Sequence, residues 1–208
     1  MDENEVRPSS MVLIQQNGAR AAPHACIEIN RGLAPTELYA RGYFEASIDL
    51  VERCASNALP CDTVFYPSVH LFRHGLELAF KSIERSSSRR NQSNSKPATG
   101  HSLDVLWKSI RDELRLCFLP HEPALEPEWT QLRVEDVDEV IAQLTELDAR
   151  GEAFRYDTDR KGSAYLDHIN SVDLIQLRDV IKFVSHGVMC WLHRVREMEA
   201  YYLNGKHT

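Results

Sequence analysis

The strongest constraint on the fold is a series of apolar residues near the end of the chain, spaced by alternating steps of three and four. The series comprises Leu174, Leu177, Ile181, Val184, Val188, Trp191, Val195 and Met198. This spacing places all of them on one face of an α-helix, and such a face must pack against other helices. The sequence therefore predicts a long helix that starts at Ser171 and belongs to a helical bundle.

Four further segments show helical spacing and helix-starting residues. The first begins near Thr36 and ends before Pro60, and the second runs from after Asp62 to about Ile83. The third is capped by Ser102, and the fourth spans about 135–149. About five helices of this kind predict a mostly α fold, an antiparallel helical bundle. Minor irregular or strand elements are expected, including a strand or extended arm at 11–14.

Composition and the positions of the loop-forming stretches indicate one domain. Residues 1–10 are polar and charged and are predicted to be disordered, and residues 11–204 form a single helical domain. The Ser-, Asn- and Arg-rich stretch at about 86–100 is predicted to be a flexible loop. The acidic N-terminus lacks the positive start of a secretory signal, and no apolar run could span a bilayer. We therefore expect a cytoplasmic protein without a membrane partner, whose five scattered cysteines are reduced thiols.

The charge of the chain argues against general affinity for nucleic acid. Its formal net charge is -7, which disfavours binding of phosphates over the whole surface. One local concentration of basic residues stands out, at Lys81, Arg85, Arg89, Arg90 and Lys96. A solvated loop and a phosphate contact both fit this stretch.

A polar stripe interrupts the apolar second helix. His70, Arg73, His74, Glu77 and Lys81 share one side of that helix. In one interpretation the stripe is solvated or forms a buried polar network, with His101 and Arg155 as further members. In the other it binds a phosphate or a base through the set Arg73, His74, Glu77, His101 and Arg155.

Other site chemistries have less support in the sequence. The spacing of His70, His74 and Glu77 suits zinc, but no fourth ligand of recognisable type accompanies them. Phosphate-binding loops, dinucleotide turns and the Gly-x-Ser-x-Gly motif are absent from the sequence. We accordingly predict no metal site and no cofactor.

Three sequence motifs occur in an order typical of a known family. They are the segment from Phe65 to Lys81, the segment from Gly100 to Trp107, and Leu147-Asp148 followed by Phe154-Arg155-Tyr156 and Asp159. Together they resemble a bacterial group of HEPN-like proteins over roughly residues 40–195. One departure is Asp157, where that group tends to have proline. The resemblance implies a four-helix core, homodimers, and relatives that act as RNases in toxin or antiviral systems beside relatives without known activity.

Catalytic HEPN proteins carry an Arg, four to six intervening residues and then a His. Arg115 and His121 have that separation, but Pro120 lies between them. Arg178 and His186 lie on the strongest helix with seven residues between them, and eight helical steps correspond to about 12 Å of rise. Neither pair reproduces the motif in its expected place.

The resemblance thus implies a HEPN-like module that binds nucleotide or RNA or interacts with protein, and the sequence shows no intact catalytic motif. Its expected partners are a second copy of the chain in a homodimer, a nucleotide or RNA, and a protein encoded nearby. The alternative is a metal-independent RNase of the toxin or phage-defence type. Candidates for its Arg and His are Arg73, His74, Arg178 and His186.

Overall fold

The predicted mostly α architecture is confirmed. The computed structural model describes residues 35–56, 58–90, 100–117 and 131–204. It contains α1 (Pro35–Ala55), α2 (Cys61–Arg90), α3 (Leu103–Cys117), α4 (Val134–Asp148) and α5 (Leu174–Asn204). Within these ranges the β-type pairing is limited to an isolated antiparallel bridge between Thr158 and Ala164. The predictions for residues 1–10 and 11–14 fall outside the described residues.

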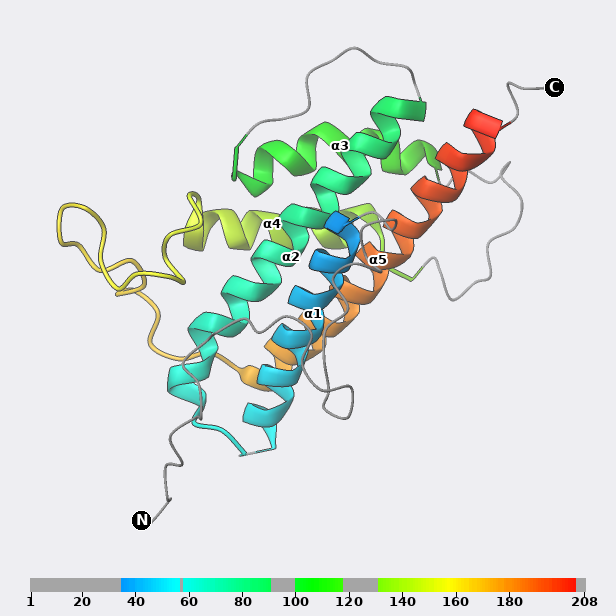
Figure 1. Ribbon diagram of the computed structural model, residues 1–208. Helices are drawn as coiled ribbons and strands as arrows, with labels where there is room; N and C mark the ends of the chain where they lie inside the picture. The colour runs from blue at the N-terminus through cyan, green and yellow to red at the C-terminus, as the bar shows by residue number, and fades with distance from the viewer. Residues whose placement is uncertain (1–34, 57, 91–99, 118–130, 205–208) are drawn as a thin grey trace, which may run out of the picture.

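The helices form two groups, with α2 at the centre. Helices α1, α2 and α5 lie side by side, and α1 runs antiparallel to the other two (Figure 1). Helices α3 and α4 run antiparallel to each other and cross this layer at a steep angle (Figure 1). Helix α2 contacts α1, α5 and α3. A polar side chain in the middle of α2 is therefore surrounded by neighbouring elements.

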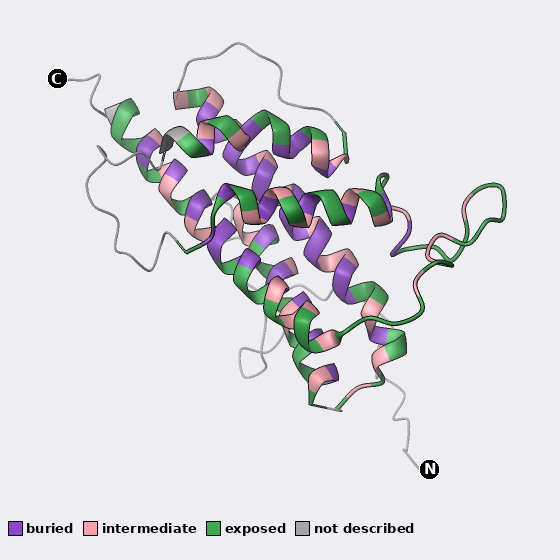
Figure 2. Cartoon of the chain, turned by 180° about the vertical axis from the view of Figure 1, so that it is seen from behind, coloured by how far each residue is buried: buried purple, intermediate pink, exposed green. Residues whose placement is uncertain are grey.

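The predicted apolar face of α5 forms a large part of the core. Its residues from Ile181 onward in the series are buried, while Leu174 and Leu177 at the helix start are half-buried. Figure 2 shows the buried face as a stripe along the helix. Trp191 stacks on Trp107 of α3 with ring centroids 6.1 Å apart. This contact ties the crossing pair of helices to the layer below.

Helix α2 is longer than the sequence analysis predicted. It continues beyond Ile83 to Arg90, so the prediction of a loop from about 86 is wrong for residues 86–90. Packing overrides the polar composition there, because Ser86 and Ser87 are buried. Arg89 also pairs with Glu199 at 2.8 Å, and Arg90 forms an ion pair with Glu113. Residues 91–99 lie outside the described residues.

The basic concentration at the end of α2 is occupied by internal contacts. Arg85 donates a hydrogen bond to the hydroxyl of Thr36 at 3.0 Å, and Lys81 pairs with Glu77. With the ion pairs of Arg89 and Arg90, the described part of this stretch links α2 to α1, α3 and α5. Lys96 lies outside the described residues.

The start of α5 differs slightly from the prediction. The helix begins at Leu174, and Asp173 rather than Ser171 caps it. The Asp173 carboxylate accepts hydrogen bonds from the backbone N–H groups of Ile175 and Gln176 at 2.9 and 3.0 Å. A carboxylate is favoured at a helix N-terminus, which explains the choice of cap. None of the described helices has the length and apolar character needed to cross a membrane.

Candidate functional site

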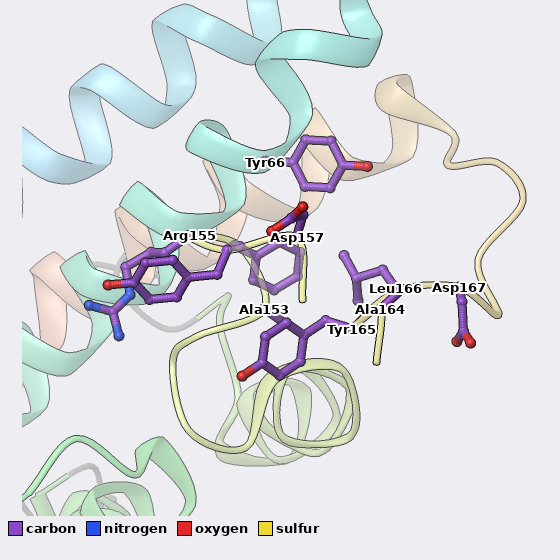
Figure 3. A pocket seen from close by; sticks show the side chains of 10 residues that line it. Tyr66, Ala153, Arg155, Asp157, Ala164, Tyr165, Leu166 and Asp167 are labelled. Carbon is purple, nitrogen blue, oxygen red and sulfur yellow. The ribbon is translucent and has the colours of Figure 1, made fainter. Parts of the chain in front are cut away.

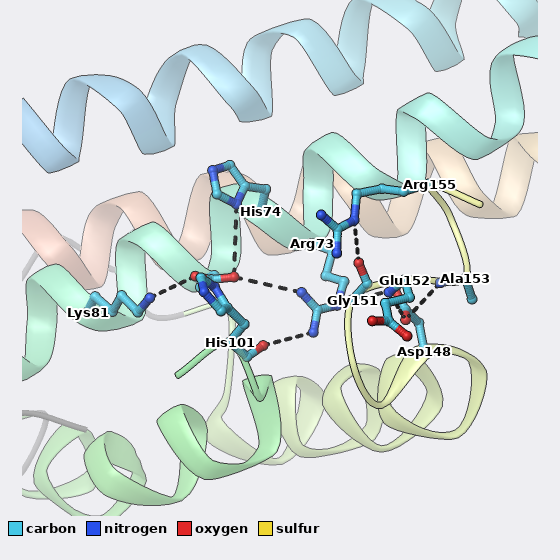
Figure 4. Close-up of polar contacts among 10 residues, drawn as sticks. Arg73, His74, Lys81, His101, Asp148, Gly151, Glu152, Ala153 and Arg155 are labelled. Atoms are coloured by element: carbon cyan, nitrogen blue, oxygen red, sulfur yellow. Dashed lines mark hydrogen bonds and ion pairs between the residues drawn. The ribbon is translucent and has the colours of Figure 1, made fainter. Parts of the chain in front are cut away.

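The polar stripe of α2 is the centre of a cluster that joins several elements. Helix α2 supplies Arg73, His74, Glu77 and Lys81, and the segment before α3 supplies His101 (Figure 4). The last residue of α4, Asp148, completes the group. We call these six residues the Glu77 cluster. The predicted proximity of His101 to the stripe is therefore observed.

Arg73 is the buried cation of the Glu77 cluster. Only 4% of the residue is exposed, and its side chain lies between two carboxylates. Its Nε lies 3.5 Å from Asp148 Oδ2, and its Nη1 lies 3.7 Å from Glu77 Oε2. Its Nη2 donates a hydrogen bond to the carbonyl oxygen of His101 at 2.9 Å. Burial lowers the pKa of the guanidinium, but arginine remains charged, so its position depends on both acids.

Glu77 is the hub of the Glu77 cluster. Its Oε1 accepts hydrogen bonds from Lys81 Nζ at 2.7 Å and from the ring nitrogen Nδ1 of His101 at 2.8 Å. Burial alone would raise the pKa of Glu77, but the hydrogen bonds from Lys81 and His101 outweigh it and hold that pKa below its usual value. The carboxylate is therefore charged at neutral pH, and its Oε1 already accepts two hydrogen bonds.

The two histidines of α2 have less polar surroundings. The His74 ring packs edge-on against Tyr43 of α1 with centroids 4.5 Å apart, and its Nδ1 lies 3.9 Å from Glu77 Oε2. The His70 ring stacks beside it with centroids 6.2 Å apart. Burial is the main cause that lowers the pKa of both rings, and nearby cations add to it. Both imidazoles are therefore neutral at pH 7.

The turn after α4 fits closely around Arg73. Gly151 has a positive φ of 75°, and a Cβ at this position would lie 2.8 Å from Arg73 Nη1. Asp148 Oδ1 accepts hydrogen bonds from the backbone N–H groups of Glu152 and Ala153 at 2.6 and 3.0 Å. Asp148 thus holds both the guanidinium and the turn. Sequence reasoning gave neither Asp148 nor Gly151 a site role, although an acid at the apolar spacing of α4 was a usable signal.

Arg155 follows this turn and points toward solvent. Its Nε donates to the carbonyl oxygen of Gly151 at 2.6 Å, and its guanidinium lies 5.4 Å from the centre of the Tyr156 ring. Burial is the largest cause that lowers the pKa of His70 and of Arg73, and the charge of Arg155 lowers both further. Arg155 therefore lies near both residues. The predicted second cation therefore stands at the edge of the Glu77 cluster.

A groove of about 460 Å³ opens on the other side of Arg155. Its lining is rich in aromatic rings and includes Tyr66, Phe154, Tyr156 and Tyr165, together with Leu166 (Figure 3). We call this the tyrosine groove. Tyr66 and Tyr156 are exposed, and Tyr165 donates a hydrogen bond to Glu152 at 2.8 Å. The sequence analysis missed this groove, because only the fold brings Tyr66 of α2 beside the 153–167 segment.

The candidate Arg and His of α5 lie outside both features. Arg178 pairs with the neighbouring Asp179 at 2.8 Å. His186 is exposed, and its Nε2 lies 3.7 Å from the thiol of Cys190. Arg115 pairs with Glu135 at 2.8 Å, and His121 is not among the described residues. In the described structure, neither Arg178 nor His186 contacts a residue of the Glu77 cluster.

The described ranges contain no group of three or more His, Cys, Asp or Glu side chains arranged to hold a metal ion. The helical spacing of His70, His74 and Glu77 therefore does not bring three ligands together there.

Comparison of the chain with models of known protein families, with curated proteins and with solved structures finds no match.

The outward side of the Glu77 cluster carries positive charge. The two acids are buried, and each accepts two hydrogen bonds from groups of the protein. Toward solvent the cluster presents the Lys81 ammonium and the His74 and His101 rings, and Arg155 stands beside them. Such an edge attracts an anion, and protonated rings would strengthen the attraction.

Proposed function

We propose that the chain is a HEPN-like binding module for a phosphate-bearing ligand, a nucleotide or RNA. One observation carries the proposal: the acids of the Glu77 cluster are buried and already paired with cations and N–H donors of the protein, whereas Lys81 and Arg155 stand at its edge. Lys81 Nζ uses one of its three N–H donors on Glu77, and Arg155 uses its Nε on Gly151. Their remaining donors suit the oxygens of a phosphate.

The tyrosine groove supports a ligand that carries a base as well as a phosphate. It begins at Arg155 and offers exposed aromatic faces at Tyr66 and Tyr156. Bases of single-stranded nucleic acid stack on such rings, and each stacked base contributes about 1–3 kcal/mol. A ligand with its phosphate at Arg155 could place its base in the groove. This chemistry favours a nucleotide or a single strand over inorganic phosphate alone.

The resemblance to HEPN-like proteins supports the same class of ligand. The motifs that carry the resemblance supply most of the site, namely Arg73 to Lys81, His101, and Asp148 with Arg155. The homodimer, expected from that resemblance and from the surplus of apolar helix surface, stays a prediction, and so does a partner protein encoded nearby.

The test is binding of a fluorescently labelled single-stranded RNA to the purified protein, followed by anisotropy as salt is raised. We expect the double variant Lys81→Gln/Arg155→Gln to bind more weakly. Each phosphate contact on a single strand contributes roughly 0.7 to the slope of log affinity against log salt. Loss of both contacts should therefore reduce the slope by about 1.4.

A matched control is Arg53→Gln/Lys108→Gln, which removes the same charge from two exposed helical ion pairs. It should leave the slope unchanged. Equal slopes for the two double variants, with both shown to be folded by circular dichroism, would refute phosphate binding at this edge.

An RNase is the second candidate, and the state of His74 favours it. Its neutral ring beside the Glu77 carboxylate could act as a general base toward a 2′-hydroxyl. Arg73 is buried, so Arg155 would be the exposed cation in such a mechanism. Cleavage of the RNA in the presence of EDTA, lost in His74→Ala and kept in His186→Ala, would establish this activity. Binding without cleavage would leave the module as first proposed.

A further inference from the structure

Two cysteines meet at the turn between α1 and α2, away from the Glu77 cluster. Cys54 lies near the end of α1, and Cys61 is the first residue of α2. The Cys61 thiol lies 3.7 Å from the carbonyl oxygen of Cys54. Burial is the largest cause that raises the pKa of the Cys54 thiol, and the charge of Cys61 and a hydrogen bond between the two side chains raise it further. The two side chains are therefore neighbours in the folded protein.

We propose that Cys54 and Cys61 form a redox-active dithiol pair that a hydroperoxide converts to a disulfide. A disulfide usually joins Cα atoms that are roughly 4–7 Å apart. The sulfur of Cys61 already lies 3.7 Å from a backbone atom of Cys54, so the two residues are close enough for this bond to be considered. The pair was not predicted from sequence, since the cysteines have no C-x2-C spacing.

Unequal exposure assigns different roles to the two thiols. Cys54 is 2% exposed, whereas Cys61 is half-buried and lines a groove of about 270 Å³ beside Asp62 and Tyr66. A hydroperoxide can therefore reach Cys61 first. Cys54 is placed to attack the oxidised Cys61 afterwards, because it is the neighbouring thiol.

The chemistry balances with hydrogen peroxide as the oxidant. The Cys61 sulfur attacks one oxygen, the O–O bond breaks, and the departing hydroxide takes the thiol proton to give water and a sulfenic acid. The Cys54 sulfur then attacks the Cys61 sulfur, so the S–S bond forms and the S–O bond breaks. The leaving hydroxide takes the Cys54 proton, and the sum is one disulfide and two waters.

The test uses the full chain, reduced and then treated with graded hydrogen peroxide, alkylated and digested with trypsin. Cleavage after Arg53 and Arg73 gives the peptide 54–73, which contains both cysteines and no other. We expect this peptide to lose two hydrogens and to resist alkylation until dithiothreitol is added. Cys190, half-buried on α5, is the internal control and should remain open to alkylation under the same conditions.

A Cys54→Ser variant isolates the first step. In it, Cys61 should accumulate as the sulfenic acid, which dimedone traps and mass spectrometry detects. The proposal is overturned if the wild-type peptide 54–73 stays fully alkylatable, if Cys61 advances to sulfinic acid without a disulfide, or if Cys190 is protected to the same extent. None of these readouts depends on the proposed binding of nucleotide or RNA.

Discussion

Replacement of Asp148 by asparagine tests whether the Glu77 cluster holds the fold together. Asp148 and Arg73 are both buried, with side chains 2% and 5% exposed, and their charged groups approach to 3.5 Å. Loss of one partner from a buried ion pair costs about 3–5 kcal/mol. The asparagine oxygen can still accept the hydrogen bonds of Glu152 and Ala153. We therefore expect Asp148→Asn to cost about 3 kcal/mol, the lower end of that range.

A second substitution separates the ion pair from the cap. Asp148→Ala also removes the acceptor of the two backbone N–H groups, and unsatisfied buried donors cost about 1–3 kcal/mol. It should therefore be less stable than Asp148→Asn by roughly that amount. The assay is urea unfolding at neutral pH, followed by circular dichroism, with the free energy of unfolding extrapolated to water.

The sign of the effect makes this prediction discriminating. Asp148 is the last residue of α4, where negative charge opposes the helix dipole. Removal of an isolated carboxylate there would be neutral or stabilise by about 0.3–1 kcal/mol. The control Asp49→Asn removes an exposed ion pair with Arg53 and should change stability by less than about 1 kcal/mol. If Asp148→Asn matches this control, the buried network does not stabilise the fold.

Two further predictions concern packing and pH. Gly75→Ala should cost about 1–3 kcal/mol, because the new Cβ would lie 2.6 Å from the Phe44 ring. Gly42→Ala meets nothing within 4 Å and should instead stabilise by about 0.5–1 kcal/mol in urea unfolding. The lowered pKa values of His70 and His74 predict that stability falls as pH drops through 6.5, their ordinary value, because the unfolded chain binds protons first.

For packing, equal stabilities of Gly75→Ala and Gly42→Ala would show that α1 shifts freely and that the Phe44 contact does not constrain it. For pH, the double variant His70→Asn/His74→Asn should lose less stability than wild type between about pH 7 and pH 5.5. Glu77 does not confound this window, since its pKa is lowered and its contribution is lost only below 4.5. The assignment would be refuted if the double variant lost as much stability over this pH range as the exposed control variant His168→Gln.

Sequence periodicity predicted the helices because burial of an apolar face dominates their formation. The series from Leu174 to Met198 predicted α5 and its buried side. The same reasoning failed at the end of α2, where serines are buried and arginines form ion pairs with other helices. Local composition there favours a loop, and only tertiary contacts supply the partners that extend the helix.

The candidate site was predictable where its residues share one helix. Arg73, His74, Glu77 and Lys81 follow helical spacing, so their common side could be read from the sequence. Asp148 comes from a distant helix, and its pairing with Arg73 depends on how α4 crosses α2. The tyrosine groove likewise depends on the turn at Gly151, whose positive φ directs the following segment past α2. Residue spacing can indicate that Asp148 lies on the buried side of α4, but it does not indicate which residue of another helix it meets.

The Glu77 cluster links the proposed ligand to the stability of the fold. The Lys81 ammonium pairs with the buried Glu77 carboxylate, and its N–H groups that face solvent would meet a phosphate. An ammonium has three N–H donors, so a bound phosphate does not have to displace the carboxylate. A phosphate at this edge would also favour protonation of His74, whose pKa burial now lowers. Binding should therefore tighten as pH falls. The unliganded fold loses stability over the same pH range, and the ligand opposes this loss because it binds the folded state alone.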